Sequence, residues 1–299
     1  MAGPPAARTL RPGQRLGVLA WRTMMGIAAS LTRLRKQSPP GEISHHAYGP
    51  HPAERLEWIE PRAGSPARLP VVYVHGGGWI CGKKELYTDE LLFLAEAGHP
   101  VFNLEYPLAP EHPHPQMLLS LLEALAWIGE QHPGYEAVHL MGDSAGGNLA
   151  LMLGILSANP ALTKLLDPAP CRPTPRPQSV ISLYGVLDRL SWIDRRFPSA
   201  ALMLECYAGP GALEREVGPE YAVTPMDLSF ESLPPTLIAV GSKDPLAESS
   251  RLCAERLQAG FDRVEYQVYP GEAHGFFNRR GRPASQQLRR DILDFLSRH

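Results

Sequence analysis

Two glycine-rich motifs, each directly after a short apolar run, constrain this chain more than any other feature. His75 to Trp79 reads HGGGW, and Gly142 to Gly147 reads GDSAGG. Residues 69–74 precede the first motif and residues 137–141 precede the second, and both runs are typical of strands. We therefore expect both motifs at turns that follow strands, where glycine permits tight bends and leaves the backbone accessible.

The second motif contains the pattern G-x-S-x-G, with Ser144 at its centre. This pattern places a serine on a sharp strand-to-helix turn, so that its hydroxyl group is exposed at the edge of a sheet. The apolar residues 148–156 that follow are typical of a buried helix. Because the context fits on both sides, Ser144 is predicted to be a nucleophile for acyl transfer.

The HGGG run has two interpretations. After a strand, bare glycine backbone presents amides that bind the oxyanion of an acyl-transfer reaction. Glycine-rich turns also bind phosphate, but the Lys-Ser/Thr ending of a phosphate-binding loop is absent here, and no G-x-G-x-x-G opens a helix. An oxyanion hole is therefore favoured. Its predicted donors are the amides of Gly77, Gly78 and Ala145, with Gly76 as the neighbour that could substitute.

With three further segments, these motifs resemble the hormone-sensitive-lipase-like esterases of the α/β-hydrolase superfamily. The segments are EYPLAPEHP at 105–113, GSKDPL at 241–246 and EAHGF at 272–276. All five motifs occur in the family's order, and the resemblance does not extend to residues 1–50. It implies an α/β-hydrolase fold, with a mostly parallel central sheet, helices on both faces and a cap. It also implies a preference for short to medium acyl esters.

A serine hydroxyl group is a weak nucleophile until a base takes its proton, and the base needs an acid to orient it. In this fold the acid and then the histidine follow the serine, each on a loop after a later strand. Asp244 lies three residues after the apolar run 235–241, and His274 lies in the turn after the alternating run 263–269. The predicted catalytic triad is Ser144, Asp244 and His274.

Three other acids compete with Asp244 for this role. Glu248 falls in the first turn of a predicted helix, where its charge complements the helix dipole. Glu272 is too close to His274 in sequence to be its usual orienting partner. Asp262 is the third, and both position and the family resemblance favour Asp244 over it.

The remaining histidines have structural interpretations. His112 and His114 alternate with prolines and are expected to serve in packing or at the surface of a rigid loop. His75 is predicted to fix the glycine loop through a hydrogen bond. His45 and His46 precede the expected catalytic sheet without cysteine or carboxylate neighbours at ligand spacing, so no metal site is predicted there. No organic cofactor is expected either.

Composition is that of one globular α/β domain. The chain has 299 residues, is 44% hydrophobic and carries a net charge of −2, so the overall balance favours neither nucleic acid nor an acidic partner. The expected partner is a small-molecule ester, and the oligomeric state is not predicted. No C-x-x-C pair occurs among Cys81, Cys171, Cys206 and Cys253. Free thiols in a cytoplasmic protein are favoured, with one long-range disulfide left open.

The order of predicted strands and helices indicates how the chain is organised into domains. Strands and helices alternate, with further helices expected at 87–98, 116–131, 248–257 and 284–298 and further strands at 101–106 and 179–184. The proline-rich run 168–177 is predicted to be a stiff exposed connection rather than a ligand for a proline-binding domain. Residues 51–299 form the expected catalytic domain. Within it, residues 187–232 are too long for a simple crossover and are expected to form a cap insertion.

Residues 1–50 are expected to be an N-terminal cap or an amphipathic segment. The first 41 residues contain six arginines, one lysine and no acid. On a helical projection Arg15, Arg22 and Arg33 form one stripe, and the apolar face is made of Leu16, Leu19, Ala20, Met24, Ile27, Leu31 and Leu34. Arg22 interrupts the apolar run, so no transmembrane span is predicted.

Three interpretations of this segment stay open. The favoured one is a cap helix that packs its apolar face on the active site. The others are a basic helix that makes peripheral contact with an anionic membrane and an organelle-targeting segment. Gly17 and Gly26 weaken each helical version.

The predicted function is that of a serine carboxylic-ester hydrolase that acts through an acyl-enzyme. An amide or formamide hydrolase would use the same triad, and a membrane-associated deacetylase of lipid or sterol esters would retain it as well. A non-enzymatic ligand receptor also exists on the family's scaffold. In that receptor the base histidine is lost, so the presence of His274 argues against this alternative.

Overall fold

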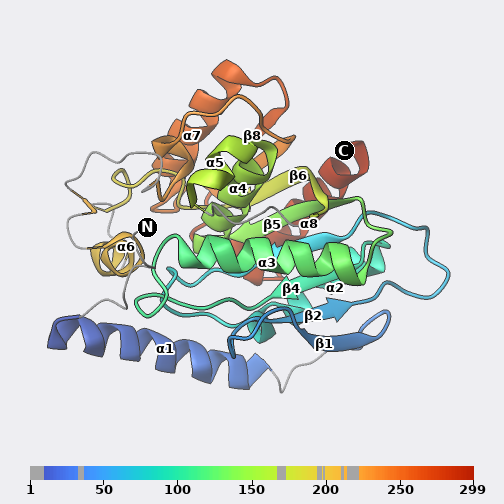
Figure 1. The fold of residues 1–299 in the computed structure, drawn as a ribbon, viewed down its shortest axis with the longest axis horizontal. Helices are drawn as coiled ribbons and strands as arrows, with labels where there is room; N and C mark the ends of the chain where they lie inside the picture. The colour runs from blue at the N-terminus through green and yellow to red at the C-terminus, as the bar shows by residue number, and fades with distance from the viewer. Residues whose placement is uncertain are drawn as a thin grey trace.

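A computed structural model describes residues 10–32, 37–166, 173–193, 197, 199–209, 212–213 and 222–299. Its centre is an eight-stranded sheet in the order β1-β2-β4-β3-β5-β6-β7-β8 (Figure 1). The antiparallel part consists of β1 (Ile43–Ala47) and β2 (Arg55–Ile59), with β2 antiparallel to both of its neighbours. The other strands are parallel: β3 (Val71–Val74), β4 (Val101–Leu104), β5 (Ala137–Asp143), β6 (Arg176–Leu183), β7 (Thr236–Gly241) and β8 (Val264–Tyr269).

Helices cover both faces of the sheet. One face packs on α2 (Thr88–Glu96) and α8 (Pro283–Arg298), and the other packs on α3 (Gln116–Gln131), α4 (Ala145–Ala158) and α7 (Ala247–Gly260). In β3, Val72 and Val74 join the core on the α3/α4 side, whereas Val71 and Tyr73 join the core on the α2/α8 side. Because β3 is buried on both faces, it reads as a continuous apolar run.

The described residues form further helical elements beside those that cover the sheet. They are α1 (Pro12–Thr32), α5 (Pro160–Leu166), α6 (Ala200–Ala208) and the 3₁₀ turns η2 (Lys84–Leu86), η4 (Pro225–Asp227) and η5 (Phe276–Asn278). The predicted fold class is confirmed, and the helix expected at 116–131 has those bounds in the structure.

The start of the sheet differs from expectation. The first strand begins at Ile43, upstream of the boundary expected at residue 50. The placement of His45 and His46 ahead of the sheet was wrong, since both lie in β1. This strand is at the edge of the sheet and none of its residues is buried. Its polar sequence, ISHHA, therefore gives no apolar run to recognise.

The proline-rich run also ends earlier than expected. Residues 168–172 lie outside the described residues, whereas Arg176 and Pro177 already belong to β6, so the exposed connection does not extend to residue 177. Proline is tolerated there because it lies near the start of the strand. Among the described residues, Cys81, Cys206 and Cys253 form no disulfide bond with one another, and Cys171 lies outside the described residues.

The orientation of α1 differs from the favoured interpretation. The helix does pack on the protein, but through Val18, Ala29 and the partly buried Trp21 and Met25. Arg22, assigned to a polar stripe, points inward instead. It donates hydrogen bonds to the carbonyl oxygens of Ile80 and Ala109 (2.9 Å each) and pairs with Glu111 (2.6 Å). The described residues of the apolar face predicted to contact the protein therefore face away from it, and Leu34 lies outside the described residues.

Gly17 has a structural role in this packing. A Cβ atom at Gly17 would lie 2.8 Å from the side chain of Leu202 in α6. Gln14 of α1 also donates to Glu205 of α6 at 2.8 Å, and Trp21 donates to Ser199 at 3.1 Å. Gly17 was expected to weaken the helix. Because it has no side chain, it instead allows α1 and α6 to approach each other closely.

Burial of His139 in β5 predicts a specific loss of stability in mild acid. Burial lowers the pKa of His139 to about 3, whereas an unfolded histidine titrates near 6.5. The folded-state pKa is the lower one, so the unfolded chain takes up the proton first and stability falls as the pH drops below about 6.5. Between about pH 7.5 and 5.5, wild type should lose roughly 1 kcal/mol more of its free energy of unfolding than His139→Asn, as measured by urea denaturation. An identical pH dependence in both proteins would contradict the assignment.

Candidate active site

Ser144 lies at the turn between β5 and α4, at the carboxyl edge of the sheet. Its backbone has φ 53° and ψ −121°, a region that costs a non-glycine residue about 1–3 kcal/mol. The turn is held by the Ser144 amide, which donates to the carbonyl oxygen of Leu183 (2.8 Å). A Cβ atom at Gly146 would collide with the carbonyl oxygens of Val74 and His75. The glycines of the motif thus allow α4 to start directly against β3, which exposes the serine hydroxyl group.

The three predicted triad residues are brought together across 130 residues of sequence. Nε2 of His274 lies 3.0 Å from Oγ of Ser144, and Nδ1 of His274 lies 2.9 and 3.1 Å from the two carboxylate oxygens of Asp244. The Asp244 side chain is fully buried, while that of His274 is 25% exposed. Asp244 also accepts a hydrogen bond from the amide of Leu246 (2.8 Å). A buried, anchored carboxylate can hold the imidazole with Nε2 directed at the serine.

The competing acids lie in other environments. Glu248 is in the first turn of α7 and pairs with Arg251 (2.7 Å). Glu272 lies 3.7 Å from Arg282, and Asp262 is exposed. Glu248 and Glu272 each lie near an arginine, whereas Asp244 contacts the imidazole of His274.

The glycine loop after β3 lies against the turn that carries Ser144, since the Gly76 amide donates to Asp143 and Gly146 packs on the carbonyl oxygen of His75. Gly77 has φ 130° and Gly78 has φ 58°, and a Cβ atom at Gly77 would overlap the carbonyl oxygen of Cys81. Within the described part of the chain, the amides of Gly77, Gly78 and Ala145 have no hydrogen-bond partner. Ala145 is the first residue of α4, whose amide has no partner within the helix. These three amides remain available for an oxyanion.

The amide of Gly76 is not available in the same way. It donates to Oδ1 of Asp143 at 2.7 Å, so Gly76 is excluded as the substitute oxyanion donor that the sequence suggested. Asp143 also accepts hydrogen bonds from the hydroxyl groups of Tyr73 (2.9 Å) and Tyr87 (3.1 Å). Burial raises the pKa of Asp143, and these hydrogen bonds oppose that rise.

Asp143 is a functional residue that sequence reasoning missed. It precedes the nucleophile in GDSAGG, and its side chain ties the glycine loop to the nucleophile turn. The alternation of side chains along β5 is the sequence signal that could have identified Asp143. Met141 of β5 faces the α2/α8 core, so Asp143, two residues later, points to the same side of the sheet. A buried acid in that position requires hydrogen-bond donors.

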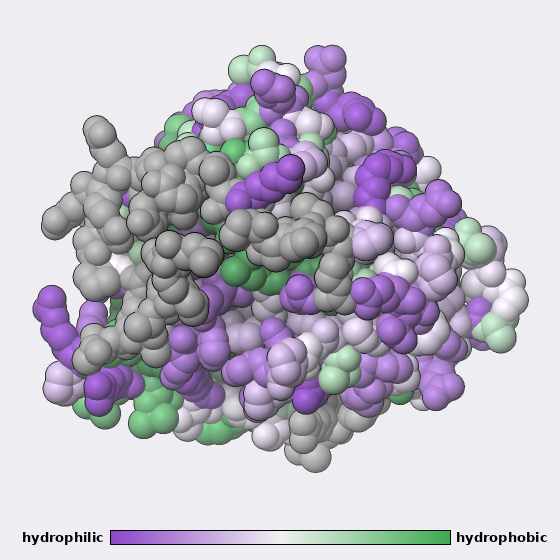
Figure 2. Space-filling view, in the orientation of Figure 1, coloured by the Kyte–Doolittle hydropathy of each residue, from purple (hydrophilic) through white to green (hydrophobic). Residues whose placement is uncertain are grey.

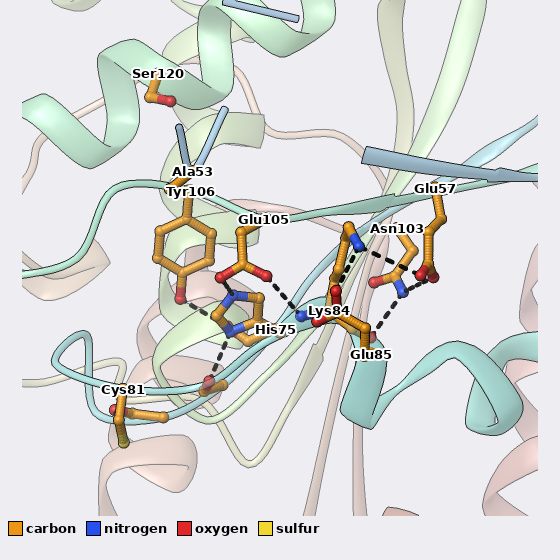
Figure 3. A network of polar contacts seen from close by, with 12 residues as sticks. Ala53, Glu57, His75, Cys81, Lys84, Glu85, Asn103, Glu105, Tyr106 and Ser120 are labelled. Carbon is orange, nitrogen blue, oxygen red and sulfur yellow. Dashed lines mark hydrogen bonds and ion pairs between the residues drawn. The ribbon is translucent and has the colours of Figure 1, made fainter. Parts of the chain in front are cut away.

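His75 supports the glycine loop from the other side. Its Nδ1 donates to the carbonyl oxygen of Gly76 (2.8 Å), and the Tyr106 hydroxyl group donates to the carbonyl oxygen of His75 (2.7 Å). Figure 3 shows the carboxylate of Glu105 beside the His75 ring, with Nε2 at 3.8 Å. Glu105 accepts in turn from the amide of Lys84 (2.8 Å). The predicted hydrogen bond that fixes the loop is present.

The described part of the 187–232 insertion contacts both halves of the site. From α6, Tyr207 stacks on Trp79 with ring centroids 4.5 Å apart, and the Met203 side chain lies against Gly78. Phe197 meets the His274 ring at 5.0 Å, perpendicular to it. The insertion thus places apolar side chains against the glycine loop and the imidazole of His274, where an acyl or alcohol group would need an apolar wall.

His114 and His112 make packing contacts, as expected. Nδ1 of His114 lies 3.3 Å from the Tyr207 hydroxyl group, and Nδ1 of His112 lies 3.1 Å from the Gln116 side-chain oxygen. His46 lies 2.8 Å from the Ser44 hydroxyl group. None of these three histidines lies in the triad.

Gly77→Ala tests the oxyanion assignment. The added methyl group would displace the loop from Cys81, and we expect kcat to fall by roughly 10² to 10³, as for the loss of one oxyanion donor. Gly64→Ala is the matched control, because Gly64 also has a positive φ (83°) but open space around it. If both variants keep near-normal kcat, the glycine loop does not bind the oxyanion.

Comparisons with known proteins agree with this geometry. A family model described as alpha/beta hydrolase fold matches residues 71–278. "Esterase LipC" of Mycobacterium tuberculosis is 27% identical over 241 residues, which cover 77% of this chain. The chain spans 58% of that relative's length.

Two solved structures share the fold. A hyperthermophilic esterase from the archaeon Pyrobaculum calidifontis has a TM-score of 0.76 and 23% identity over 93% of this chain and 90% of its own. Esterase B from Lactobacillus rhamnosis has a TM-score of 0.80 and 20% identity over 95% of this chain and 94% of its own.

Proposed function

Because this chain belongs to the α/β-hydrolase fold family, we propose that it is a serine carboxylic-ester hydrolase that acts through an acyl-enzyme. The observation that carries the proposal is the continuous chain of contacts from Asp244 through His274 to Ser144. A receptor on the same scaffold has no need of a base aligned on a strained serine. That two solved structures of this fold are named esterases supports the same activity.

The first half-reaction follows from the three side chains. Oγ of Ser144 attacks the ester carbonyl carbon while its proton passes to Nε2 of His274. Asp244 stabilises the imidazolium cation that forms. His274 then donates this proton to the oxygen of the departing alcohol, which leaves the acyl group on Ser144. Water attacks the acyl-enzyme by the same steps, with His274 again as the base.

Stabilisation of the oxyanion is the second requirement for ester hydrolysis. As the carbonyl carbon becomes tetrahedral, negative charge develops on its oxygen. Backbone amides that are already oriented and lack other partners stabilise this charge without reorganisation. The amides of Gly77, Gly78 and Ala145 fit that role. Asp143 acts as a positioning residue, because its hydrogen bond to Gly76 fixes the start of the loop.

The proposed substrates are esters with short to medium acyl chains. The proposal is supported by Phe197, which packs on His274, and by Met203, which packs on Gly78, because apolar side chains so close to the triad limit the length of acyl chain that fits. We expect kcat/KM for p-nitrophenyl esters to be highest between acetate and octanoate and to fall for hexadecanoate. A value that keeps rising to hexadecanoate would contradict this proposal and indicate a pocket for long chains.

One anilide measured beside these esters separates the main alternative. An amide hydrolase would use the same triad, but it must also protonate a poorer leaving group. We expect the anilide of the best acyl chain to react far more slowly than the matching ester. Faster hydrolysis of the anilide would overturn the ester assignment while leaving the triad in place.

A further inference from the structure

The outward face of α1 is apolar and unpartnered. We call the residues Leu16, Leu19, Met24, Ile27 and Leu31 the outer stripe; each is between 49% and 68% exposed. They lie opposite Val18 and Ala29, which hold the helix on the protein. Elsewhere in the described part of the chain, the large exposed apolar side chains are Leu190 and Val268. The outer stripe is therefore a concentrated feature rather than scattered exposure.

The space-filling view shows this concentration. Apolar atoms lie along the lower edge of the molecule in Figure 2, where Figure 1 places α1. The ribbon shows α1 lying along the outside of the molecule, with one side against the protein and the other directed away from it. A long amphipathic surface of this shape can lie flat on an interface.

The cationic side chains near the outer stripe indicate which kind of partner it would contact. Residues 1–41 contain seven cationic side chains, and Glu42 is the first acid in the sequence. Arg11 and Arg15 are exposed at the start of α1. The sequence places Arg33, Arg35 and Lys36 directly after the helix, outside the described residues. Arg11 and Arg15 therefore lie at the start of the outer stripe, and the sequence that follows α1 is cationic as well.

We propose that the outer stripe is a docking surface for an anionic lipid bilayer. Leucine, isoleucine and methionine side chains would enter the boundary of the acyl chains, and Arg11 and Arg15 would contact lipid phosphates or carboxylates. The proposed contact is peripheral. None of the described helices has the length and apolar content needed to cross a bilayer. A second copy of this chain is a weaker candidate for the partner of the outer stripe. If two copies paired through α1, the arginines of one α1 would face those of the other, and residues 1–41 contain no acid to neutralise them.

The packing of α1 connects this surface to the active site. Arg22 donates to the carbonyl oxygen of Ile80, one residue after the HGGGW motif, and Gly17 packs on Leu202 of α6. A docked α1 would therefore hold the cap and the oxyanion loop close to the lipid surface. The docking itself does not depend on ester hydrolysis and is tested separately from it.

Vesicle co-sedimentation of the full chain is the direct test. We compare vesicles of phosphatidylcholine alone with vesicles that also contain phosphatidylserine. Wild type should bind the anionic vesicles and bind the neutral vesicles weakly. Raising the salt should weaken the binding, since charges at a surface are screened over about 10 Å at 0.1 M. Failure of wild type to bind anionic vesicles would overturn the proposal.

Two variants identify the surface. Leu16→Gln/Ile27→Gln should lower binding at least roughly tenfold, because burial of even one large aliphatic side chain changes an equilibrium by about that factor. Its kcat/KM on soluble p-nitrophenyl acetate should equal that of wild type, which shows that the fold is intact. Val268→Thr is the matched control, an exposed apolar residue away from α1 that should leave binding unchanged. Binding that survives in the Leu16→Gln/Ile27→Gln variant would contradict the proposal.

A second measurement decides between lipid and protein. If the outer stripe paired with another copy, wild type would be a concentration-dependent dimer in sedimentation and Leu16→Gln/Ile27→Gln would be a monomer. That outcome, without vesicle binding, would replace the lipid surface by a self-association surface. Arg11→Gln/Arg15→Gln should weaken only the binding to anionic vesicles and reduce its dependence on salt.

Discussion

Ser144→Ala is expected to lower kcat for ester hydrolysis by roughly 10⁶-fold, because the members of a triad act as a unit. Alanine keeps the same positive φ of 53°, so the strain of the turn is unchanged and the thermal unfolding temperature should shift little. Circular dichroism and kcat on p-nitrophenyl acetate, measured on the same preparation, separate lost chemistry from a lost fold. Activity within tenfold of wild type would eliminate Ser144 as the nucleophile.

Non-additivity provides a control for this result. His274→Ala should be about as damaging as Ser144→Ala, and the double variant should be no worse than either single variant. If the losses in the double variant multiply instead, the two residues do not act in one step.

Asp244→Asn is expected to lower kcat by about 10⁴-fold. The Asp244 side chain is fully buried and accepts the hydrogen bond from Nδ1 of His274. An asparagine amide group there would donate to Nδ1, which leaves the proton on Nε2, so that Nε2 can no longer accept the proton of Ser144. Asp262→Asn is the control, because Asp262 is an exposed acid that lies two residues before β8. Equal loss in both variants would show that the effect is not specific to the triad.

The sequence predicted the catalytic centre because each part carries its own local signal. The serine turn requires glycines, and those glycines stand in the sequence whatever the rest of the chain does. Asp244 and His274 could be chosen because the fold fixes their order and the strands before them, β7 and β8, show clear apolar or alternating patterns. Positions of helices such as α3 followed from apolar periodicity for the same reason.

Features that depend on distant partners were not predicted. Both the inward direction of Arg22 and the role of Asp143 depend on such contacts. Arg22 points inward because the carbonyl oxygens of Ile80 and Ala109 lie there, 58 and 87 residues away in sequence. Asp143 was missed because its donors, Tyr73 and Tyr87, come from other elements. A helical projection shows that α1 has an apolar face, but not which face will meet the protein.

The edge of the sheet was missed for a related reason. The first strand, β1, is not buried, so its polar side chains do not report the pairing with β2 that the backbone makes. The cap was predicted only as an insertion of unusual length. The contacts of Phe197 with His274 and of Tyr207 with Trp79 depend on how that insertion folds back over the site.

Covalent trapping of the nucleophile tests the central claim most directly. A p-nitrophenyl alkylphosphonate reacts with an activated serine and leaves a stable phosphonyl group on its oxygen. Mass spectrometry of the digested protein should show one adduct per chain, on the peptide that contains Ser144, and none in Ser144→Ala. Pre-incubation with a slowly hydrolysed ester should delay the labelling. An adduct on a different residue, or no adduct on catalytically active protein, would contradict the account.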